Sequence, residues 1–405
     1  MTGFIEYFKT FTPTQSTDEQ GLKVNNHLHT PFSFSAFSKV SDALDQSVEE
    51  GVKVVGVNDF FSFDAYPEWC EGAFDRNLFP LFNVEFIGLN EAYQKEGLKV
   101  NDPGNPGRTY FSGKGLAYPL VLSQETKSKI AKLVDDANQY VREMTDKVNA
   151  LFAKKQFGFS LDFDKIKTDL AKGQVRERHL ARAIRILAEK HYKDSNRLLN
   201  FYIELLDTNG ISSKLDDEAG IENEIRNALL KADKAAYVAE DPNGFLSVEE
   251  IRSIIIEAGG IPTYPFLADA VKGFTDFERS KAKVAAMLKE MGVWSVEFIP
   301  TRNELSELKK YAKYLFDQGF VVSFGTEHNS PGKQLIEVKA KNGVQLDEEM
   351  LAINYEGACI TAAHQYLYAK QGEGVLDKEG TFKVAERQKF SELGNALIKH
   401  ITDKK

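Results

Sequence analysis

Apolar runs alternate with amphipathic segments along the first third of the chain. Residues 22–29 and 78–88 are expected as strands, and the continuous apolar run at 52–57 is typical of a strand buried on both faces. A strand–helix–strand order with segments of this length and spacing predicts parallel strands joined by right-handed crossovers. The helix expected between the first two strands has apolar residues at helical spacing and ends in a glycine: Val40, Leu44, Val48 and Gly51.

The pattern changes between residues 120 and 245, where charged helical segments dominate and no convincing strand is found. The clearest of these segments are residues 130–144 and 175–192. A stretch of this length without strands predicts a helical insertion that covers an active-site face of the alternating part.

Alternation resumes after residue 246. Ser247 and Glu250 form a capping box ahead of a helix, and a strand follows that helix up to residue 266. The remaining elements are expected as strands at 293–299 and 320–329, and as helices at 303–318, 353–370 and 384–402.

We therefore expect an α/β protein with a single barrel built from residues 1–119 and 246–333. Residues 120–245 form the helical insertion, and residues 334–405 form a C-terminal helical extension. The glycine- and proline-rich residues 97–118 are expected as a long mobile loop, of the kind that often serves as a lid.

Composition narrows the class of protein. With 42% apolar and 27% charged residues the chain is typical of a globular protein, and a net charge of −9 without a basic stripe argues against nucleic-acid and membrane surfaces. No segment approaches the roughly twenty apolar residues of a membrane span, and the N-terminus lacks the pattern of a secretion signal. We therefore expect a cytoplasmic protein, with Cys70 and Cys359 as small buried side chains.

Polar residues stand at the end of five expected strands. His27 and His29 are two apart on the first strand, so both side chains project to the same face. In a barrel of parallel strands all of these ends meet at the carboxyl face, where such barrels place their chemistry. Imidazole and carboxylate ligands together suit Zn²⁺, Mn²⁺ or Fe²⁺. The other strand ends carry Asn58 and Asp59, Asn83 and Glu85, Tyr264, and Glu327, His328 and Asn329.

The order and the amino-acid sequences of these segments resemble the PHP family (polymerase and histidinol phosphatase domains). "HLHTPFS" from His27 matches the first motif of that family, and "GVKVVGVND" and "NVEF" are similar to the second and third. "ERHLARAI", "KAAYVAEDPNGFLSVEEIRSIIIEAGGIPTYP" and "GFVVSFGTEHNSPG" resemble later segments, so the likeness covers residues 22–333. It implies a distorted (β/α)₇ TIM-like barrel and the activity of a metal-dependent phosphoesterase, most similar to the branch that acts on small nucleotides.

Several positions depart from the family pattern. Phe60 and Tyr264 stand where the family has histidines, and Phe34 replaces an acidic residue expected after the first motif. Asn329 takes the place of the histidine in the last motif, and Tyr110 stands where another histidine is often found. Phenylalanine cannot bind a metal ion, and a cluster of ions needs several anionic ligands to hold like charges together. The resemblance with these losses predicts a reduced site of one or two divalent ions, or a barrel that has lost its metal.

The resemblance also assigns the metal-ligand positions. They fall on His27, His29, Glu85 and Glu327, with His328 as a further candidate. If residues 320–329 are extended, only one of Glu327 and His328 can face the site, and Glu327 holds the ligand position.

Four further residues are candidates for catalysis or substrate binding. Asp59 either binds the metal or orients its neighbours, and Tyr264 either offers a hydroxyl or packs as a ring. Arg178 and His179 match a family position that can face the substrate phosphate, and Arg182 lies one helical turn later. The alternative for this segment is a solvated charged helix.

Two functions of different classes follow. The first is metal-dependent hydrolysis of a small phosphate ester, such as a nucleotide or sugar phosphate, with no nucleic-acid or membrane partner. The second is a catalytically inactive barrel that binds a ligand or acts as a regulator, since Phe34, Phe60 and Tyr264 make the expected pocket more apolar. An amidohydrolase-type enzyme would require further histidines on the middle strands and an aspartate on the last strand, and the expected strands carry neither of these features.

Overall fold

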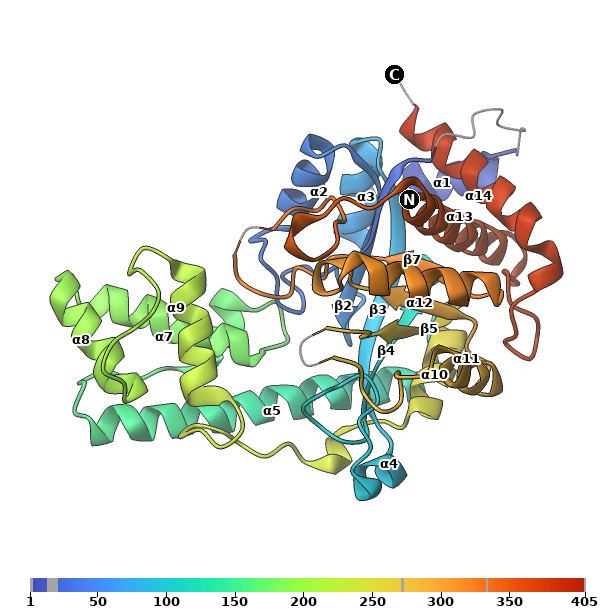
Figure 1. The fold of residues 1–405 in the computed structure, drawn as a ribbon. Coiled ribbons are helices and arrows are strands. Elements are labelled where there is room, and N and C mark those ends of the chain that lie inside the picture. The colour runs from blue at the N-terminus through green and yellow to red at the C-terminus, as the bar shows by residue number, and fades with distance from the viewer. Residues whose placement is uncertain (1–2, 13–20, 271–272, 333, 404–405) are drawn as a thin grey trace.

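Seven strands form one mixed sheet that is nearly closed into a barrel (Figure 1). The computed structural model describes residues 3–12, 21–270, 273–332 and 334–403. Residue 333, the expected boundary between barrel and extension, lies outside these ranges. In sheet order, which is also chain order, the strands are β1 (Lys23–Leu28), β2 (Val52–Phe60), β3 (Phe79–Leu89), β4 (Arg108–Lys114), β5 (Ile261–Phe266), β6 (Ser295–Phe298) and β7 (Val321–Phe324).

The barrel closes between β1 and the segment after β7. The backbone N–H of His29 donates to the carbonyl of Glu327 (2.8 Å), and the N–H of Glu327 donates to the carbonyl of His27 (2.9 Å). Strands β1 to β3 and β5 to β7 are parallel, as expected from the sequence, so their carboxyl ends meet at one face. The closure therefore brings the end of β7 directly against the two histidines.

The prediction of a loop over residues 97–118 is wrong for its second half. Residues 108–114 form β4, which pairs antiparallel with both β3 and β5 and lies in the middle of the sheet. This strand carries Arg108 and Lys114 at its ends and a glycine beside Lys114, so it lacks an apolar run of the kind that identifies β2 and β3. Tertiary pairing on both edges makes it a strand despite that composition.

Helices cover the outside of the barrel. The capping box expected at Ser247 is present, with the hydroxyl accepting from the N–H of Glu250 (3.2 Å). The covering helices are α1 (Gly3–Thr10), α2 (Val40–Glu49), α3 (Tyr66–Asp75), α10 (Val248–Glu257), α11 (Lys281–Glu290) and α12 (Leu305–Asp317). The short α4 (Glu91–Glu96) follows β3 and buries none of its residues.

Residues 124–238 form a group of helices with an apolar core of their own. Phe152, Leu180 and Phe201 are among its buried side chains. Figure 1 shows α7, α8 and α9 extending away from the strands, with the long α5 running from them back to the barrel. These helices are α5 (Gln124–Lys154), α6 (Phe163–Lys165), α7 (Glu177–His191), α8 (Ser195–Leu206) and α9 (Glu218–Ile225), with π-helical turns at Ile166–Leu170 and Arg226–Leu230.

The C-terminal extension seals the amino end of the barrel with α13 (Glu348–Gln371), against which α14 (Arg387–Thr402) packs. Asn354 on α13 donates to the carbonyl of Val24 (3.2 Å) and accepts from the N–H of Phe324 (2.8 Å). Gln365 accepts from the N–H of Phe82 (2.9 Å). The extension thus satisfies strand backbone groups that would otherwise be buried without partners.

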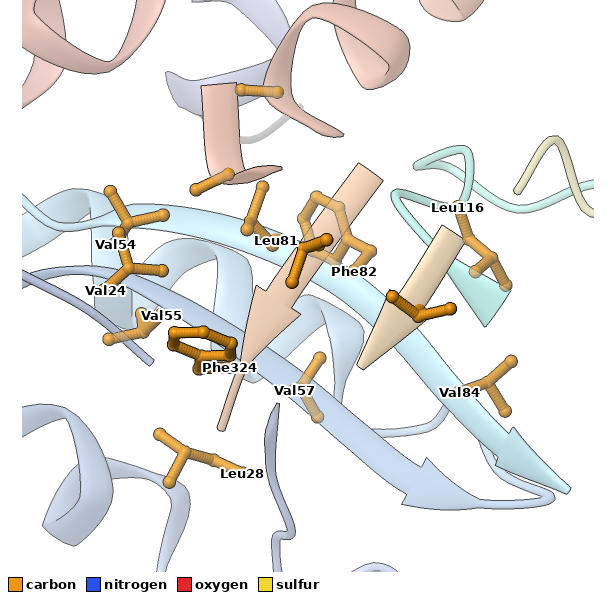
Figure 2. Packing of buried hydrophobic residues seen from close by; sticks show 14 of the residues in the cluster. Val24, Leu28, Val54, Val55, Val57, Leu81, Phe82, Val84, Leu116 and Phe324 are labelled. Atoms are coloured by element: carbon orange, nitrogen blue, oxygen red, sulfur yellow. The ribbon is translucent and has the colours of Figure 1, made fainter. Parts of the chain in front are cut away.

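The strands bury a continuous apolar core. Figure 2 shows Val24, Val54, Leu81 and Phe82 from three neighbouring strands packed together, with Phe324 of β7 close by.

No helix among the described residues combines the length and the apolar character that crossing a membrane requires.

Candidate metal centre

His27, His29 and Glu85 converge at the carboxyl end of the barrel. The Nε2 atoms of the two histidines lie 3.1 Å apart, and Oε2 of Glu85 lies 3.4 Å from Nε2 of His29 and 3.8 Å from Nε2 of His27. All three side chains are buried, and their ligand atoms lie within 4.8 Å of one another. Strand pairing explains the meeting, because β1, β2 and β3 are parallel neighbours. His27 and His29 lie at the end of β1, and Glu85 lies within β3, opposite Phe60 at the end of β2.

The other ring nitrogen of each histidine is held by a hydrogen bond. Nδ1 of His27 lies 2.9 Å from Oε2 of Glu297, and Nδ1 of His29 lies 3.0 Å from the hydroxyl of Ser33. That hydroxyl donates to Asp59 (2.6 Å), so it accepts from His29. Both Nδ1 atoms therefore carry the proton, which leaves both Nε2 atoms as acceptors.

Asn58 packs beside His27 without taking its free lone pair. Its amide nitrogen lies 3.1 Å from Nδ1 and 2.9 Å from Nε2 of that ring. Because the amide is nearly equidistant from the two ring nitrogens, it lies against the face of the imidazole. The two Nε2 lone pairs thus face each other across 3.1 Å, an arrangement that is repulsive unless a proton or a metal ion lies between them.

Glu85 completes a set of donors that fits a divalent metal ion. Its buried Oε2 has no hydrogen-bond partner among the described residues. Burial raises the pKa of Glu85 to about 8. A buried carboxyl oxygen without a partner, beside two acceptor nitrogens, is the environment that a bound cation satisfies.

The protonation of His29 suits the same role. Burial lowers the pKa of its imidazole to about 4, against the smaller opposing effect of Asp59. His29 is therefore neutral at pH 7, which is the form that binds metals. The ring of Phe60 packs against it at a centroid distance of 4.9 Å.

Asp59 is fully engaged with the loop that follows β1. It accepts from the N–H of Thr30 (2.7 Å), from the Thr30 hydroxyl (2.5 Å) and from Ser33 (2.6 Å). Burial raises the pKa of Asp59, and these donors and His29 oppose that shift. The structure places Asp59 behind His29, where it orients the ring through Ser33.

Glu327 and His328 point in different directions. Both have left-handed backbone conformations, with φ values of 67° and 58°, so this segment is not extended. The carboxylate of Glu327 faces the cavity, where it pairs with Arg302 and accepts from the amide of Asn329 (2.8 Å). His328 turns away from His27 and His29, bonds Thr326 (2.8 Å) and stacks on Phe37.

Tyr264 and His179 do not line the cavity. The hydroxyl of Tyr264 donates to Glu278 (2.8 Å) inside the core. Nδ1 of His179 accepts from the backbone N–H of Arg176 (2.9 Å) at the start of α7, and burial lowers the pKa of His179 to about 3. The structure thus places both residues in packing and capping contacts.

A cavity of about 230 Å³ opens next to Glu85, which lines it, whereas the buried His27 and His29 are not among its lining residues. Its walls combine acidic and basic side chains, and two of its arginines form no ion pair with a carboxylate among the described residues. Arg176 lies over the ring of Phe60 at 4.5 Å, and Arg178 donates to Ser330 (2.7 Å) and Asn223 (3.3 Å). The lining includes Ser33, Phe34, Phe60, Glu85, Arg176, Arg178, Arg226, Arg302, Glu327 and Asn329.

Sequence reasoning missed Glu297, Arg176 and Arg302 as parts of this site. A single glutamate within the apolar run 293–299 is the signal that could have identified Glu297, since an unpaired charge is costly in a buried strand. The two arginines carry no comparable signal, because charged residues are common on helices and turns.

Comparisons with known proteins support the fold. No family model matches the chain, and no curated protein matches it. A proposed metal-dependent phosphoesterase from Bifidobacterium adolescentis has a solved structure that is similar over 84% of this chain and 96% of its own, with a TM-score of 0.53 and 15% identity. The solved structure of an amidohydrolase from Chromobacterium violaceum, with bound sulfate and no metal, is similar over 81% of this chain and 95% of its own, with a TM-score of 0.49 and 14% identity. The first likeness agrees with the PHP-like barrel that the sequence motifs indicate.

Proposed function

We propose that this protein is a metal-dependent hydrolase of a small phosphate ester, with a centre formed by His27, His29 and Glu85. The observation that carries the proposal is the pair of facing Nε2 atoms, 3.1 Å apart, next to a buried carboxylate oxygen without a partner. The likeness in fold to a proposed metal-dependent phosphoesterase supports the same conclusion.

The donor set indicates the class of metal. Two imidazole nitrogens and one carboxylate oxygen suit Zn²⁺, Mn²⁺ or Fe²⁺ and leave open positions for water and substrate. When bound, such an ion lowers the pKa of a water molecule and neutralises developing negative charge. Glu297 and Ser33 fix the orientation of the two rings, a role that commonly changes metal affinity by about 10- to 100-fold.

The arginines of the cavity indicate an anionic substrate. Arg176 and Arg178 face the cavity without a carboxylate partner, so their guanidinium groups are available to a phosphate. A planar guanidinium donates two parallel hydrogen bonds to phosphate oxygens and would orient the ester beside His27, His29 and Glu85. Glu327, held by Arg302, presents a further carboxylate on the wall of the same cavity.

The first experiment measures metal content and activity together. Wild-type protein purified without chelators should contain Zn, Mn or Fe and should hydrolyse a generic aryl phosphate. His27→Ala should lose both the metal and the activity, because one of the three donors is removed. His191→Ala is the matched control, since that exposed histidine on α7 lies away from the cavity. Retention of activity by metal-free His27→Ala would overturn the proposal.

One observation favours the second candidate, a barrel that binds an anion without turning it over. Phe60 occupies a family ligand position and packs on both His29 and Arg176, which gives the cavity an apolar wall. This candidate predicts wild-type protein that takes up no metal on addition of Zn²⁺ or Mn²⁺ and still binds inorganic phosphate through Arg176 and Arg178.

A further inference from the structure

Lys114 is a buried lysine whose ammonium group is surrounded by oxygen atoms. Its side chain is 1% exposed, and it enters the barrel interior from the end of β4. Nζ contacts the backbone carbonyl of Asn26 (3.1 Å), the amide oxygen of Asn58 (3.3 Å) and Oε1 of Glu297. These oxygens come from β1, β2 and β6, so the group lies where three strands face the centre of the barrel.

Glu297 connects this ammonium to the metal centre. One of its carboxylate oxygens pairs with Lys114, and the other accepts from Nδ1 of His27 at 2.9 Å. The ammonium and the centre are therefore separated by a single carboxylate.

Burying a lysine is costly unless its charge has a function or a close partner. A carbonyl, an amide oxygen and a carboxylate are also the ligands that proteins offer to hard metal cations. The oxygen cage around Nζ therefore has the chemistry of a cation site, and the chain fills it with its own side chain.

We propose that the ammonium of Lys114 takes the place of a second metal ion, so that the centre holds one exchangeable ion beside one built-in cation. The inference rests on the proposed function, because it concerns the metal count of the same site. Both oxygens of Glu297 are already engaged, and a second divalent ion next to the ammonium would face repulsion between like charges.

The metal count of the wild-type protein tests the inference directly. Titration of chelator-treated protein with Mn²⁺, followed by electron paramagnetic resonance, should give one equivalent with the spectrum of an isolated ion. A spin-coupled pair at two equivalents would overturn the inference and leave the proposed function standing. Absence of bound Mn²⁺ and Zn²⁺ would overturn both.

Variants at Lys114 provide the second test. Lys114→Ala removes the ammonium and leaves the oxygen cage with an uncompensated carboxylate, so it should take up a second equivalent of Mn²⁺ and show spin coupling. Lys114→Ala combined with Glu297→Gln should return to one equivalent, because the cage then lacks its negative charge. A folded Lys114→Ala protein that still binds one equivalent of Mn²⁺ would overturn the inference. If that variant does not fold, the number of Mn²⁺ equivalents bound by the wild-type protein decides between the two outcomes.

Discussion

Arg178 illustrates how one side chain in this protein is prepared for an external partner. It is anchored through hydroxyl and amide oxygens, Ser330 (2.7 Å) and Asn223 (3.3 Å), which fix the guanidinium without neutralising it. Burial lowers the pKa of Arg178 to about 10, with Arg226 adding to the effect, so it stays charged at neutral pH. A fixed, charged and unneutralised guanidinium on a cavity wall is suited to an anion.

Arg178→Ala should therefore weaken binding of a phosphate ester. A hydrogen bond to a charged group contributes about 1.5–3 kcal/mol, so KM should rise by roughly 10- to 100-fold. Arg182→Ala is the matched control, because Arg182 pairs with Glu222 and does not line the cavity. Steady-state kinetics on both variants tests this, and equal KM values for wild type and Arg178→Ala would contradict it.

At the scale of the elements, the approach of β7 to β1 positions the first histidine. Gly325 follows β7 directly, and a side chain there would overlap Cβ of His27 and come within 2.8 Å of its backbone nitrogen. The glycine therefore allows the backbone contact that closes the barrel beside His27 and His29.

Gly325→Ala should displace His27 and loosen this closure. Overpacking of this kind costs about 1–3 kcal/mol of unfolding free energy, and metal affinity should fall because one ligand moves. Gly210→Ala is the control, since nothing lies within 4 Å of its added carbon, and it should change stability by less than about 0.5 kcal/mol. Urea unfolding and Zn²⁺ titration measure both effects, and equal behaviour of the two variants would refute the argument.

The elements also differ in how far local pattern identifies them. Strands β2 and β3 follow from their apolar runs, whereas β4 was missed because it places arginine, lysine and glycine in a central strand. Its identity depends on pairing with β3 and β5, and β5 lies about 150 residues further along the chain.

At the scale of the whole molecule, His364 joins the C-terminal extension to the barrel. Its Nε2 donates to the carbonyl of Gly259 ahead of β5 (2.8 Å), and its Nδ1 accepts from the N–H of Val375 (3.1 Å). Only the neutral ring can do both. Burial lowers the pKa of His364 to about 4, with the carbonyl of Gly259 opposing this and Lys383 adding to it.

Stability should therefore depend on pH through this residue. The pKa is about 6.5 when unfolded and about 4 when folded, so its contribution is present above pH 6.5 and is lost as pH falls toward 4. The shift corresponds to on the order of 3 kcal/mol of unfolding free energy. Urea unfolding of wild type and His364→Gln from pH 7 to pH 4 measures it. The deficit of the variant should shrink as pH falls, and a constant deficit would show that His364 does not titrate in this way.

Residues close in sequence determined much of the candidate site. His27 and His29 share a face because side chains alternate along a strand. The parallel order expected of the first three strands then places Glu85 of the third strand beside them. Apolar periodicity likewise predicted most of the helices and strands, including α10 with its capping box and the two helices of the extension. These features depend on local backbone geometry, which a short stretch of sequence specifies.

Only the tertiary structure decided what surrounds those ligands. Glu297 and Lys114 meet behind His27 although 183 residues separate them along the chain. The turn after β7 sends Glu327 into the cavity and His328 away from it, because two left-handed residues replace the extended backbone that alternation assumes. Contacts of this kind depend on chain closure and on packing across distant segments, so no local pattern along the sequence encodes them.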